Sequence, residues 1–321
     1  MPLDLSRTLV VGISSRALFD LEEENKIYEK EGLKPYSCYQ IEHEDEVLNP
    51  GTAFPLVEAL LKLNEGHEER VVEVVVMSRN SPDTGLRIFN SLDHYSLDIT
   101  RTALTGGEPL APYLKAFHVD LFLSKDAGDV QAAVDAGVAA AHVYDPPPGF
   151  KPDTEKVRIA FDYDGVLVSE ESEKIYQREG LKAFLKHERN NADRPLPEGP
   201  FAKLLTTISQ LQRNADPAER PVRVAVVTAR NRPAHERVIR TLRAWDVQVD
   251  SAFFMGGIPK DEVLKAFRAH IFFDDQEVHI GLASAVVPSA KVPYRTSSIA
   301  NADFAAGTAP RQSAPRANEK G

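Results

Sequence analysis

The sequence predicts an α/β protein made of two duplicated Rossmann-like halves, each with a parallel sheet covered by helices. Short apolar runs that are typical of buried strands alternate with amphipathic segments that are typical of helices. The pattern of residues 1–150 returns in residues 151–285, and long self-similarity indicates duplication. A proline-rich connection, DPPPGFKPDTEK at 145–156, marks the boundary between the two halves.

The N-terminal half begins with a strand-like apolar run and a charged helical stretch. An amphipathic helix, a second strand, a further helix and a third strand are expected after them. These six elements are expected at residues 8–13, 21–33, 55–64, 71–78, 85–95 and 120–124.

The C-terminal half repeats this order of elements. They are expected at residues 157–161, 169–181, 202–211, 222–228, 236–246 and 270–274. The stretch 182–200 belongs to the segment between the strand at 157–161 and the helix at 202–211, so it suits a small cap over the strand ends. Residues 286–321 are rich in Ala, Ser, Pro and Arg and predict a mobile C-terminal tail without a core of its own.

The repeat stays in register over most of the chain. Ile27-Tyr28 matches Ile175-Tyr176 at a separation of 148 residues, and Gly106-Gly107 matches Gly256-Gly257 at a separation of 150. The packing residues of the two halves therefore correspond, and each polar residue at a strand end can be compared with its counterpart.

Composition excludes several classes of function. The formal net charge of −10 argues against binding a nucleic acid polymer, which needs a basic face. Cys38 is the only cysteine, so the chain has no internal disulfide and suits a reducing compartment. No apolar run has the length needed to span a bilayer, and we expect no membrane partner and a cytoplasmic location.

Carboxylates follow two of the predicted strands in the C-terminal half. Asp162 and Asp164 come after the strand at 157–161, while Asp274 ends the strand at 270–274 and Asp275 follows it. Side chains two apart on a strand project to one side, so the first pair needs either a cation or a retained proton. Both states serve phosphate transfer, which uses a metal-bound nucleophile and a protonated acid. By itself, D-x-D-G also suits an ordinary turn.

The N-terminal half has lost these carboxylates. The matched pairs are Asp162 with Ser14, Asp164 with Arg16, Lys260 with Leu110, Asp274 with Ser124, and Asp275 with Lys125. A divalent cation needs several oxygen ligands, so we assign the chemistry to the C-terminal half. Shaping the pocket, holding a homo-oligomer together and binding a regulator are the roles left open for the degenerate half.

Four strand-end motifs of the C-terminal half, FDYDGVL, VVTAR, GGIPK and IFFDD, together resemble the haloacid dehalogenase superfamily of phosphatases. The resemblance implies that Asp162 is the nucleophile that forms an aspartyl-phosphate and that Asp164 is the general acid and base. It implies a Mg²⁺ ion held by the carboxylate of Asp162, the backbone carbonyl of Asp164 and the carboxylate of Asp274.

The same resemblance gives roles to three further residues. Thr228 would donate its hydroxyl to the substrate phosphate, and Lys260 would supply positive charge to the transferring phosphoryl group. Asp275 would orient a metal-bound water or Lys260.

Longer segments, among them SSRALFDLEEENKIYEKEGL, TGGEPLAPYLKAFHVDLFLS and IFFDDQ, make the run 11–280 similar to the cytosolic 5′-nucleotidase I family. That likeness implies Mg²⁺-dependent dephosphorylation of nucleoside 5′-monophosphates. Tyr163 between the aspartates and Arg79 in the N-terminal half depart from the expected pattern. Two alternatives stay open: a phosphatase for sugar phosphates or other small phosphomonoesters, and a nucleotide-binding regulator without turnover.

Two residues near these motifs have competing interpretations. Arg230 follows Thr228 and either contacts phosphate or forms a surface ion pair. Tyr163 either packs against a neighbouring strand or stacks on a nucleobase. No motif that we recognise indicates which base or sugar the substrate carries. The same holds for allosteric effectors and for the oligomeric state.

Overall fold

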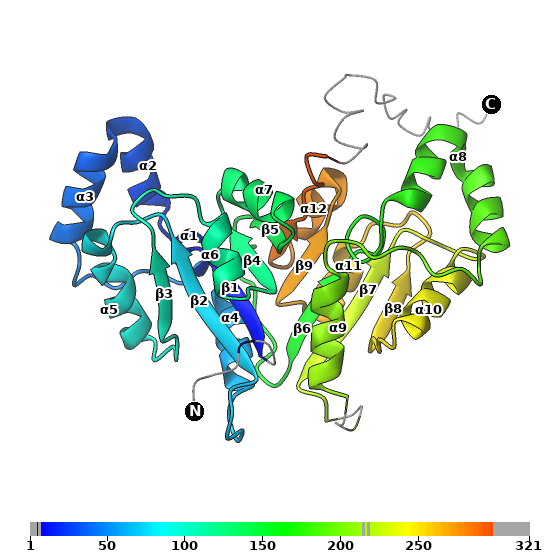
Figure 1. The fold of residues 1–321 in the computed structure, drawn as a ribbon, viewed down its shortest axis with the longest axis horizontal. Helices are drawn as coiled ribbons and strands as arrows, with labels where there is room; N and C mark the ends of the chain where they lie inside the picture. Colours follow the sequence, from blue (N-terminus) through cyan, green and yellow to red (C-terminus); the bar gives the residue numbers. More distant parts are fainter. Residues whose placement is uncertain (1–4, 6–7, 214–215, 217–218, 298–321) are drawn as a thin grey trace.

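The computed structural model describes residues 5, 8–213, 216 and 219–297. Within them, one ten-stranded sheet in the order β3-β2-β1-β4-β5-β10-β9-β6-β7-β8 runs through the whole molecule. Helices cover both of its faces (Figure 1). This architecture confirms the predicted α/β class.

Neighbouring strands pair in parallel except at the centre of the sheet, where β5 and β10 are antiparallel. The strands are β1 Leu9–Ile13, β2 Val72–Ser78, β3 Arg101–Leu104, β4 Leu121–Ser124, β5 Ala139–Val143, β6 Val157–Phe161, β7 Val222–Thr228, β8 Ser251–Phe254, β9 Ile271–Asp274 and β10 Ser289–Lys291. The predicted parallel pairing is confirmed within each half.

The helices begin and end close to the predicted bounds where the sequence showed amphipathic patterns. They are α1 Ser15–Leu18, α2 Glu22–Glu31, α3 Leu33–Glu42, α4 Phe54–Lys62, α5 Leu86–His94, α6 Ala111–Ala116, α7 Ala127–Asp135, α8 Glu171–Asn190, α9 Ala202–Leu211, α10 His235–Ala244, α11 Asp261–Phe267 and α12 Glu277–Ala283, with a 3-10 helix at η2 Pro82–Thr84. The segment between β1 and β2 thus corresponds to the segment between β6 and β7.

The strand order is symmetric about its centre. Reading outwards from the antiparallel pair, β5, β4, β1, β2 and β3 mirror β10, β9, β6, β7 and β8. Equivalent strands of the two halves therefore meet at the centre, with Val143 opposite Ala290 and His142 opposite Lys291. The duplication thus produces one continuous sheet.

Three apolar clusters of described residues build the core. One lies on a single face of the sheet and joins both halves, with side chains from α1, α4, α5, α9 and α10. On the opposite face, α6 and α7 pack on the N-terminal half and α11 and α12 pack on the C-terminal half. Strands that are buried on both faces explain the near-continuous apolar runs in the sequence.

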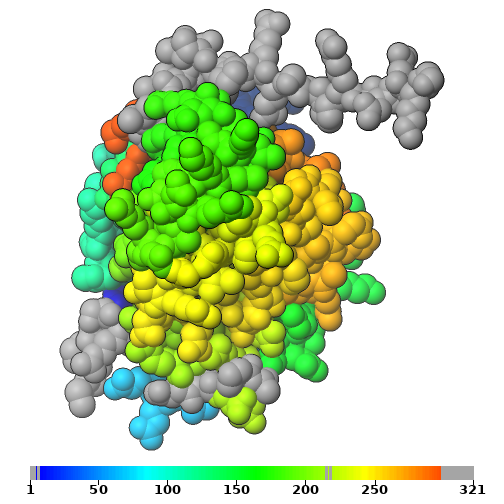
Figure 2. Space-filling model, turned by 90° about the vertical axis from the view of Figure 1, so that its right-hand side faces the viewer, coloured from blue at the N-terminus to red at the C-terminus, as the bar shows by residue number. Residues whose placement is uncertain are grey.

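A helical projection stands over the strand ends in each half. In the N-terminal half it is the pair α2 and α3, which meet at Gly32 with φ of 87°. In the C-terminal half it is α8, which kinks at the equivalent Gly180 with φ of 78°. Figure 1 shows the two projections at opposite sides of the molecule, and in Figure 2 the green α8 lies against the yellow segment of α10. Positive φ explains why glycine stands at both bends.

The boundary of the predicted tail was placed too early. Residues 289–291 form β10 at the centre of the sheet, and Val287 and Val292 beside them are buried. The repeat continues here, since Ala140 and Tyr144 match Ala290 and Tyr294 at the separation of 150. The rest of the predicted tail, 298–321, lies outside the described residues, and whether the two halves fold as separate domains stays a prediction.

Across the described ranges, no helix combines the length and the apolar character needed to cross a bilayer.

Candidate active site

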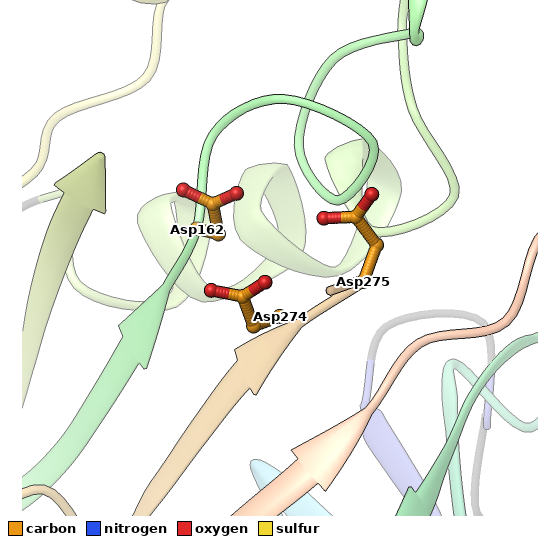
Figure 3. A group of neighbouring side chains, drawn as sticks. All are labelled: Asp162, Asp274 and Asp275. Carbon is orange, nitrogen blue, oxygen red and sulfur yellow. The ribbon is translucent and has the colours of Figure 1, made fainter. Parts of the chain in front are cut away.

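Three buried carboxylates meet where β6 and β9 end. Asp162 directly follows β6, Asp274 is the last residue of β9, and Asp275 comes next. One oxygen from each lies within 4.8 Å of the others. Figure 3 shows the three carboxylates grouped at the tips of the two strands. The ends of adjacent parallel strands therefore bring together residues that are more than a hundred positions apart in the sequence.

A buried lysine lies among these carboxylates. Lys260, directly before α11, places Nζ 2.8 Å from Oδ1 of Asp162 and 2.6 Å from Oδ2 of Asp274. His279 on α12 has its Nδ1 3.2 Å from Oδ2 of Asp274. The backbone N–H of Gln276 donates to Oδ1 of the same aspartate at 2.9 Å. Asp274 is thus held from three sides.

The charges of this cluster do not balance by themselves. Burial raises the pKa of Asp162 to about 7, with Asp274 and Asp164 adding to the effect and Lys260 opposing it. The pKa of Asp275 lies well above its ordinary value because of burial and the neighbouring Asp162 and Asp274. Burial also opposes ionisation of Asp274, but Lys260 and His279 outweigh it and lower that pKa. Ionising all three aspartates requires more positive charge than Lys260 supplies.

Gly165 allows Asp275 to approach the loop after β6. Its φ of 75° is costly for other residues, and a Cβ there would lie 2.6 Å from Oδ2 of Asp275. The phenol of Tyr294, beyond β10, donates to the same oxygen. The glycine of the D-x-D-G motif is therefore required both by the turn and by a carboxylate of the site.

The cluster fits a divalent cation. It offers oxygen ligands from three aspartates, the donor type that Mg²⁺ prefers. Oδ1 of Asp275 is buried and accepts no hydrogen bond from any described residue. An acceptor buried without a partner is costly, and a bound cation or its water would satisfy it. The residues present therefore suit the divalent metal expected from the sequence.

Asp164 lies apart from this group, since its carboxylate pairs with Arg230. Nε and Nη2 of Arg230 donate to the two carboxylate oxygens, each at 2.7 Å. The guanidinium also lies over the rings of Tyr163 and Phe184, at 5.0 and 5.3 Å from their centroids. Arg230 is 4% exposed, so the surface ion pair considered from the sequence is wrong. Tyr163 is fully buried, as its packing interpretation expects.

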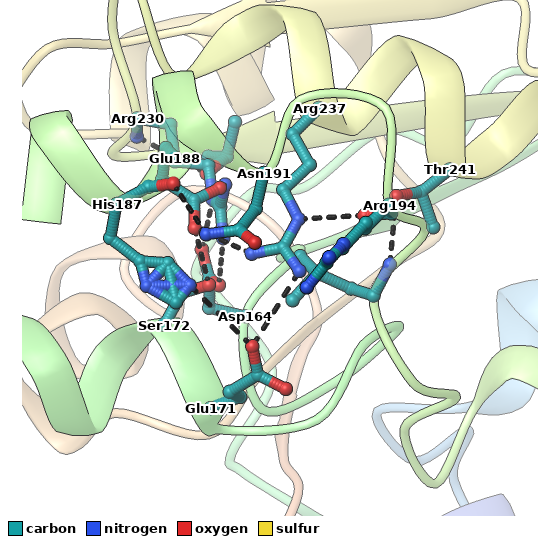
Figure 4. A network of polar contacts seen from close by, with 12 residues as sticks. Asp164, Glu171, Ser172, His187, Glu188, Asn191, Arg194, Arg230, Arg237 and Thr241 are labelled. Carbon is teal, nitrogen blue, oxygen red and sulfur yellow. Dashed lines mark hydrogen bonds and ion pairs between the residues drawn. The ribbon is translucent and has the colours of Figure 1, made fainter.

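Arg230 also connects Asp164 to the helical projection. Its Nη1 donates to Glu188 on α8, and Nη1 of Arg237 on α10 donates to the other oxygen of Glu188 at 2.9 Å. Ser172 at the start of α8 donates to Glu188 at 2.8 Å. Figure 4 shows this network running from Asp164 through Arg230 and Glu188 to Arg237. A buried carboxylate is thereby held by two guanidinium groups and a hydroxyl.

Glu188 and Arg237 were not among the site residues expected from the sequence. A signal existed, because Arg237 matches Arg87 in the repeat and both are buried arginines. Nε of Arg87 donates to the carbonyl of Glu46, and Nε of Arg237 donates to the carbonyl of Arg194, both at 2.9 Å. Arg237 therefore belongs to the shared scaffold of the two halves.

Thr228 ends β7, the strand beside β6. It is buried, and its Oγ1 accepts the backbone N–H of Arg230 at 3.2 Å. An accepting hydroxyl keeps its own proton available for donation. Its role toward phosphate stays a prediction.

Comparison with known proteins gives two findings. A sequence model of the family described as 5'-nucleotidase matches residues 1–299. The human protein named cytosolic 5'-nucleotidase 1B is 37% identical over 283 residues, which are 85% of this chain and 46% of the human protein. The chain thus spans about half the length of this curated relative. No solved structure matched the chain.

Proposed function

Because the chain belongs to the 5'-nucleotidase family, we propose that it hydrolyses nucleoside 5′-monophosphates to nucleoside and phosphate with Mg²⁺, through an aspartyl-phosphate. The observation that carries this proposal is the buried group of Asp162, Asp274 and Asp275 around Lys260. The name of the human relative supports both a nucleotide substrate and a cytosolic location.

Asp162 and Asp274 would hold Mg²⁺ with their carboxylates, and the free Oδ1 of Asp275 would contact the ion or one of its waters. The backbone carbonyl of Asp164 is proposed as a further ligand. The cation would neutralise charge on the carboxylates and on the substrate phosphate, which keeps Asp162 ionised. Lys260 would then balance the charge that remains.

In the first chemical step, an oxygen of Asp162 forms a bond to phosphorus while the bond from phosphorus to the ribose O5′ breaks. Asp164 gives its proton to O5′ as the nucleoside leaves. In the second step, Asp164 takes a proton from water, the water oxygen bonds to phosphorus, and the bond to Asp162 breaks. Phosphate is released, and both aspartates return to their starting states.

The ion pair with Arg230 bears on the role of Asp164 as general acid and base. The two charge-assisted hydrogen bonds from Arg230 fix the position of this carboxylate and occupy both of its oxygens. Asp164 must therefore release Arg230 before it can carry a proton to the leaving oxygen. We propose that substrate binding, beside α8, exchanges the arginine for the substrate as the partner of Asp164.

The test is phosphate release from a panel of nucleoside monophosphates and sugar phosphates, measured with Mg²⁺ and with EDTA. Wild type should release phosphate from nucleotides only with the metal, and Asp162→Asn should release none. Asp246→Asn, an exposed carboxylate of the same half, is the matched control. Preferred cleavage of ribose 5-phosphate would instead support the sugar phosphatase. A folded protein that binds Mg²⁺ but turns over nothing on the panel would overturn hydrolysis in favour of a binding role.

A further inference from the structure

The N-terminal half contains a cavity of about 430 Å³ at the place where the C-terminal half has its acidic cluster. Residues at the ends of β1, β2 and β4, namely Ser14, Ser78 and Ser124, line its floor. The helices α2 and α3 form its upper wall. Ligands of open α/β sheets bind at these carboxyl ends, and the volume suits a small molecule.

Two residues that line this cavity each carry a buried donor without an acceptor. Nε of Arg16 and Nδ2 of Asn80 make no hydrogen bond to any described residue. Gln40 donates to the hydroxyl of Tyr36 at 3.0 Å, and that hydroxyl donates to Oδ1 of Asn80 at 2.9 Å. The chain of bonds fixes the amide of Asn80 with its oxygen engaged and its NH₂ group unpaired. Leaving such donors buried without acceptors is costly.

The serines of the floor add hydroxyl protons. Oγ of Ser14 accepts the N–H of Ala17 at 3.2 Å, and Oγ of Ser124 accepts the N–H of Asp126 at 3.0 Å. Each hydroxyl has one proton, which these bonds do not use. The floor therefore has more donors than acceptors, which suits an oxyanion.

The acidic residues that also line the cavity already have partners. Glu24 accepts from Arg87 at 2.6 Å, and Asp129 pairs with Arg79. Asp126 accepts the backbone N–H of Asp129 at 2.7 Å. These carboxylates therefore do not cancel the excess of donors, and Arg16 retains a free N–H although its Nη2 pairs with Glu22 at 3.2 Å.

The wall above the floor is apolar and aromatic. Tyr28 and Tyr36 meet edge to face at 5.8 Å, and Leu33 lies beside them in the lining. Tyr28 is 51% exposed and Leu33 is 67% exposed, which leaves apolar surface at the rim. Such surface suits the planar, weakly polar body of a ligand whose charged group sits on the floor.

We propose that this cavity binds an organic phosphate directly, without a cation and without hydrolysis. Arg16, Asn80 and the floor serines would hold the phosphate, and the rim formed by Tyr28 and Leu33 would take a planar ring. Metal is not needed, since the floor supplies donors where the other half supplies carboxylates. The proposal concerns a second site and holds whether or not the C-terminal half hydrolyses nucleotides.

The experiment is calorimetric titration of the full chain in EDTA with three probes. They are inorganic phosphate, a nucleoside 5′-phosphonate that cannot be hydrolysed, and the free nucleoside. EDTA removes the cation from the acidic cluster, whose carboxylates then repel phosphate, so binding reports the N-terminal half. The variants are Arg16→Met and Tyr36→Phe, with the exposed Arg243→Met as matched control.

The phosphonate should bind at one site per chain in EDTA, and inorganic phosphate should compete with it. Arg16→Met should weaken binding about tenfold or more, since a hydrogen bond from a charged donor is lost. Tyr36→Phe should weaken it less, and Arg243→Met should not change it. Binding that is absent in EDTA, that is unchanged in Arg16→Met, or that is lost in Thr228→Val would overturn the proposal. Turnover with Mg²⁺, measured on the same samples, reports separately on the C-terminal half.

Discussion

The two crevices of the duplicated fold differ in the hydrogen-bonding groups that line them. In the C-terminal half, Asp162, Asp274 and Asp275 present acceptors around one lysine. In the N-terminal half, the positions of Asp162 and Asp274 carry Ser14 and Ser124, which have hydroxyl protons. An acceptor cluster attracts a cation, whereas a donor cluster attracts an anion.

The scaffold around the two crevices has changed much less. Arg87 and Arg237 each donate to a backbone carbonyl at the equivalent position of the loop after the projection. Ser91 accepts the N–H of Leu48 at 3.0 Å, and the equivalent Thr241 accepts the N–H of Leu196 at 3.1 Å. The buried frame was thus kept after duplication while the strand-end chemistry diverged. One sheet can therefore carry two sites, of which one favours a cation and the other favours an anion.

The largest expected effect on activity comes from replacing Asp162 by serine, the residue type of its counterpart Ser14. Asp162→Ser should lower the rate of phosphate release by about 10⁴-fold or more, because the nucleophile and a metal ligand are lost together. Initial rates with a nucleoside monophosphate and Mg²⁺ measure this. The reciprocal Ser14→Asp in that background should restore nothing, since Arg16 and Leu110 remain in place of an acid and a lysine. Retention of a tenth of the activity by Asp162→Ser would refute the assignment of the reaction to this half.

A smaller effect is expected from Arg230→Asn, which gives position 230 the residue type found at its counterpart in the repeat, Asn80. Asp164 loses both of its hydrogen bonds. We expect kcat to fall about 100-fold with little change in KM, because Arg230 no longer fixes the carboxylate in the position from which the substrate takes it over. The buried Glu188 loses one of its two arginines, which should cost about 3–5 kcal/mol of unfolding free energy. Steady-state kinetics and urea unfolding give the two readouts.

Two arginines of the shared scaffold serve as controls for that variant. Arg237→Met and Arg87→Met should each destabilise the protein, since each removes a partner of a buried carboxylate. Neither touches Asp164, so kcat of the folded fraction should stay near that of wild type. An equal loss of kcat in Arg230→Asn and Arg87→Met would mean that Arg230 acts only through folding.

Next in size is the effect of a divalent cation on stability. A ligand at 100 times its Kd stabilises the folded state by about 2.7 kcal/mol, so Mg²⁺ should raise Tm relative to EDTA. Asp275→Asn should reduce this increase because it removes a carboxylate of the cluster. Asp126→Asn, in the donor-rich half, should leave the increase intact. An unchanged Tm of wild type with Mg²⁺ and with EDTA would contradict a cation site.

Much of the fold followed from local patterns in the sequence. The apolar runs at β1, β2, β6, β7 and the repeat that relates them predicted two parallel halves, and α9 was predicted with its observed bounds. The central β10 was missed because it is only three residues long and lies in a Pro- and Ser-rich context. Its burial depends on pairing with β5, which no local pattern records.

The part of the candidate site that lies at the strand ends could be predicted from the sequence. Asp162, Asp274 and Asp275 meet because adjacent parallel strands end together. The environment of Arg230 could not be predicted, since its partner Glu188 lies 42 residues away on a helix whose kink decides where the side chain goes. The cavity of the N-terminal half could not be predicted from the sequence either. The absence of carboxylates at its strand ends indicates that a metal site is missing, but it does not show that an open cavity remains there.

The smallest expected effect concerns a buried histidine with an acidic counterpart. Nδ1 of His270 accepts the N–H of Arg158 at 3.1 Å, while in the N-terminal half a carboxylate oxygen of Asp120 accepts the N–H of Val10 at 3.0 Å. Burial lowers the pKa of His270 below its ordinary 6.5. The neutral ring therefore stabilises the fold fully above about pH 6.5, and this contribution is lost as the pH falls through the folded-state pKa.

Urea unfolding at pH 7.5 and 5.5 tests this difference between the halves. Wild type should lose on the order of 1 kcal/mol of stability between the two values through this group, because protonation removes the acceptor for a backbone N–H. His270→Asn supplies an oxygen acceptor that does not titrate, so its stability should depend less on pH over the same interval. An identical pH dependence in the two proteins would assign the acid sensitivity elsewhere. The imidazole of His270 and the carboxylate of Asp120 would then hold their equivalent backbone N–H groups equally well. The chemical divergence of the two halves would in that case be confined to their crevices.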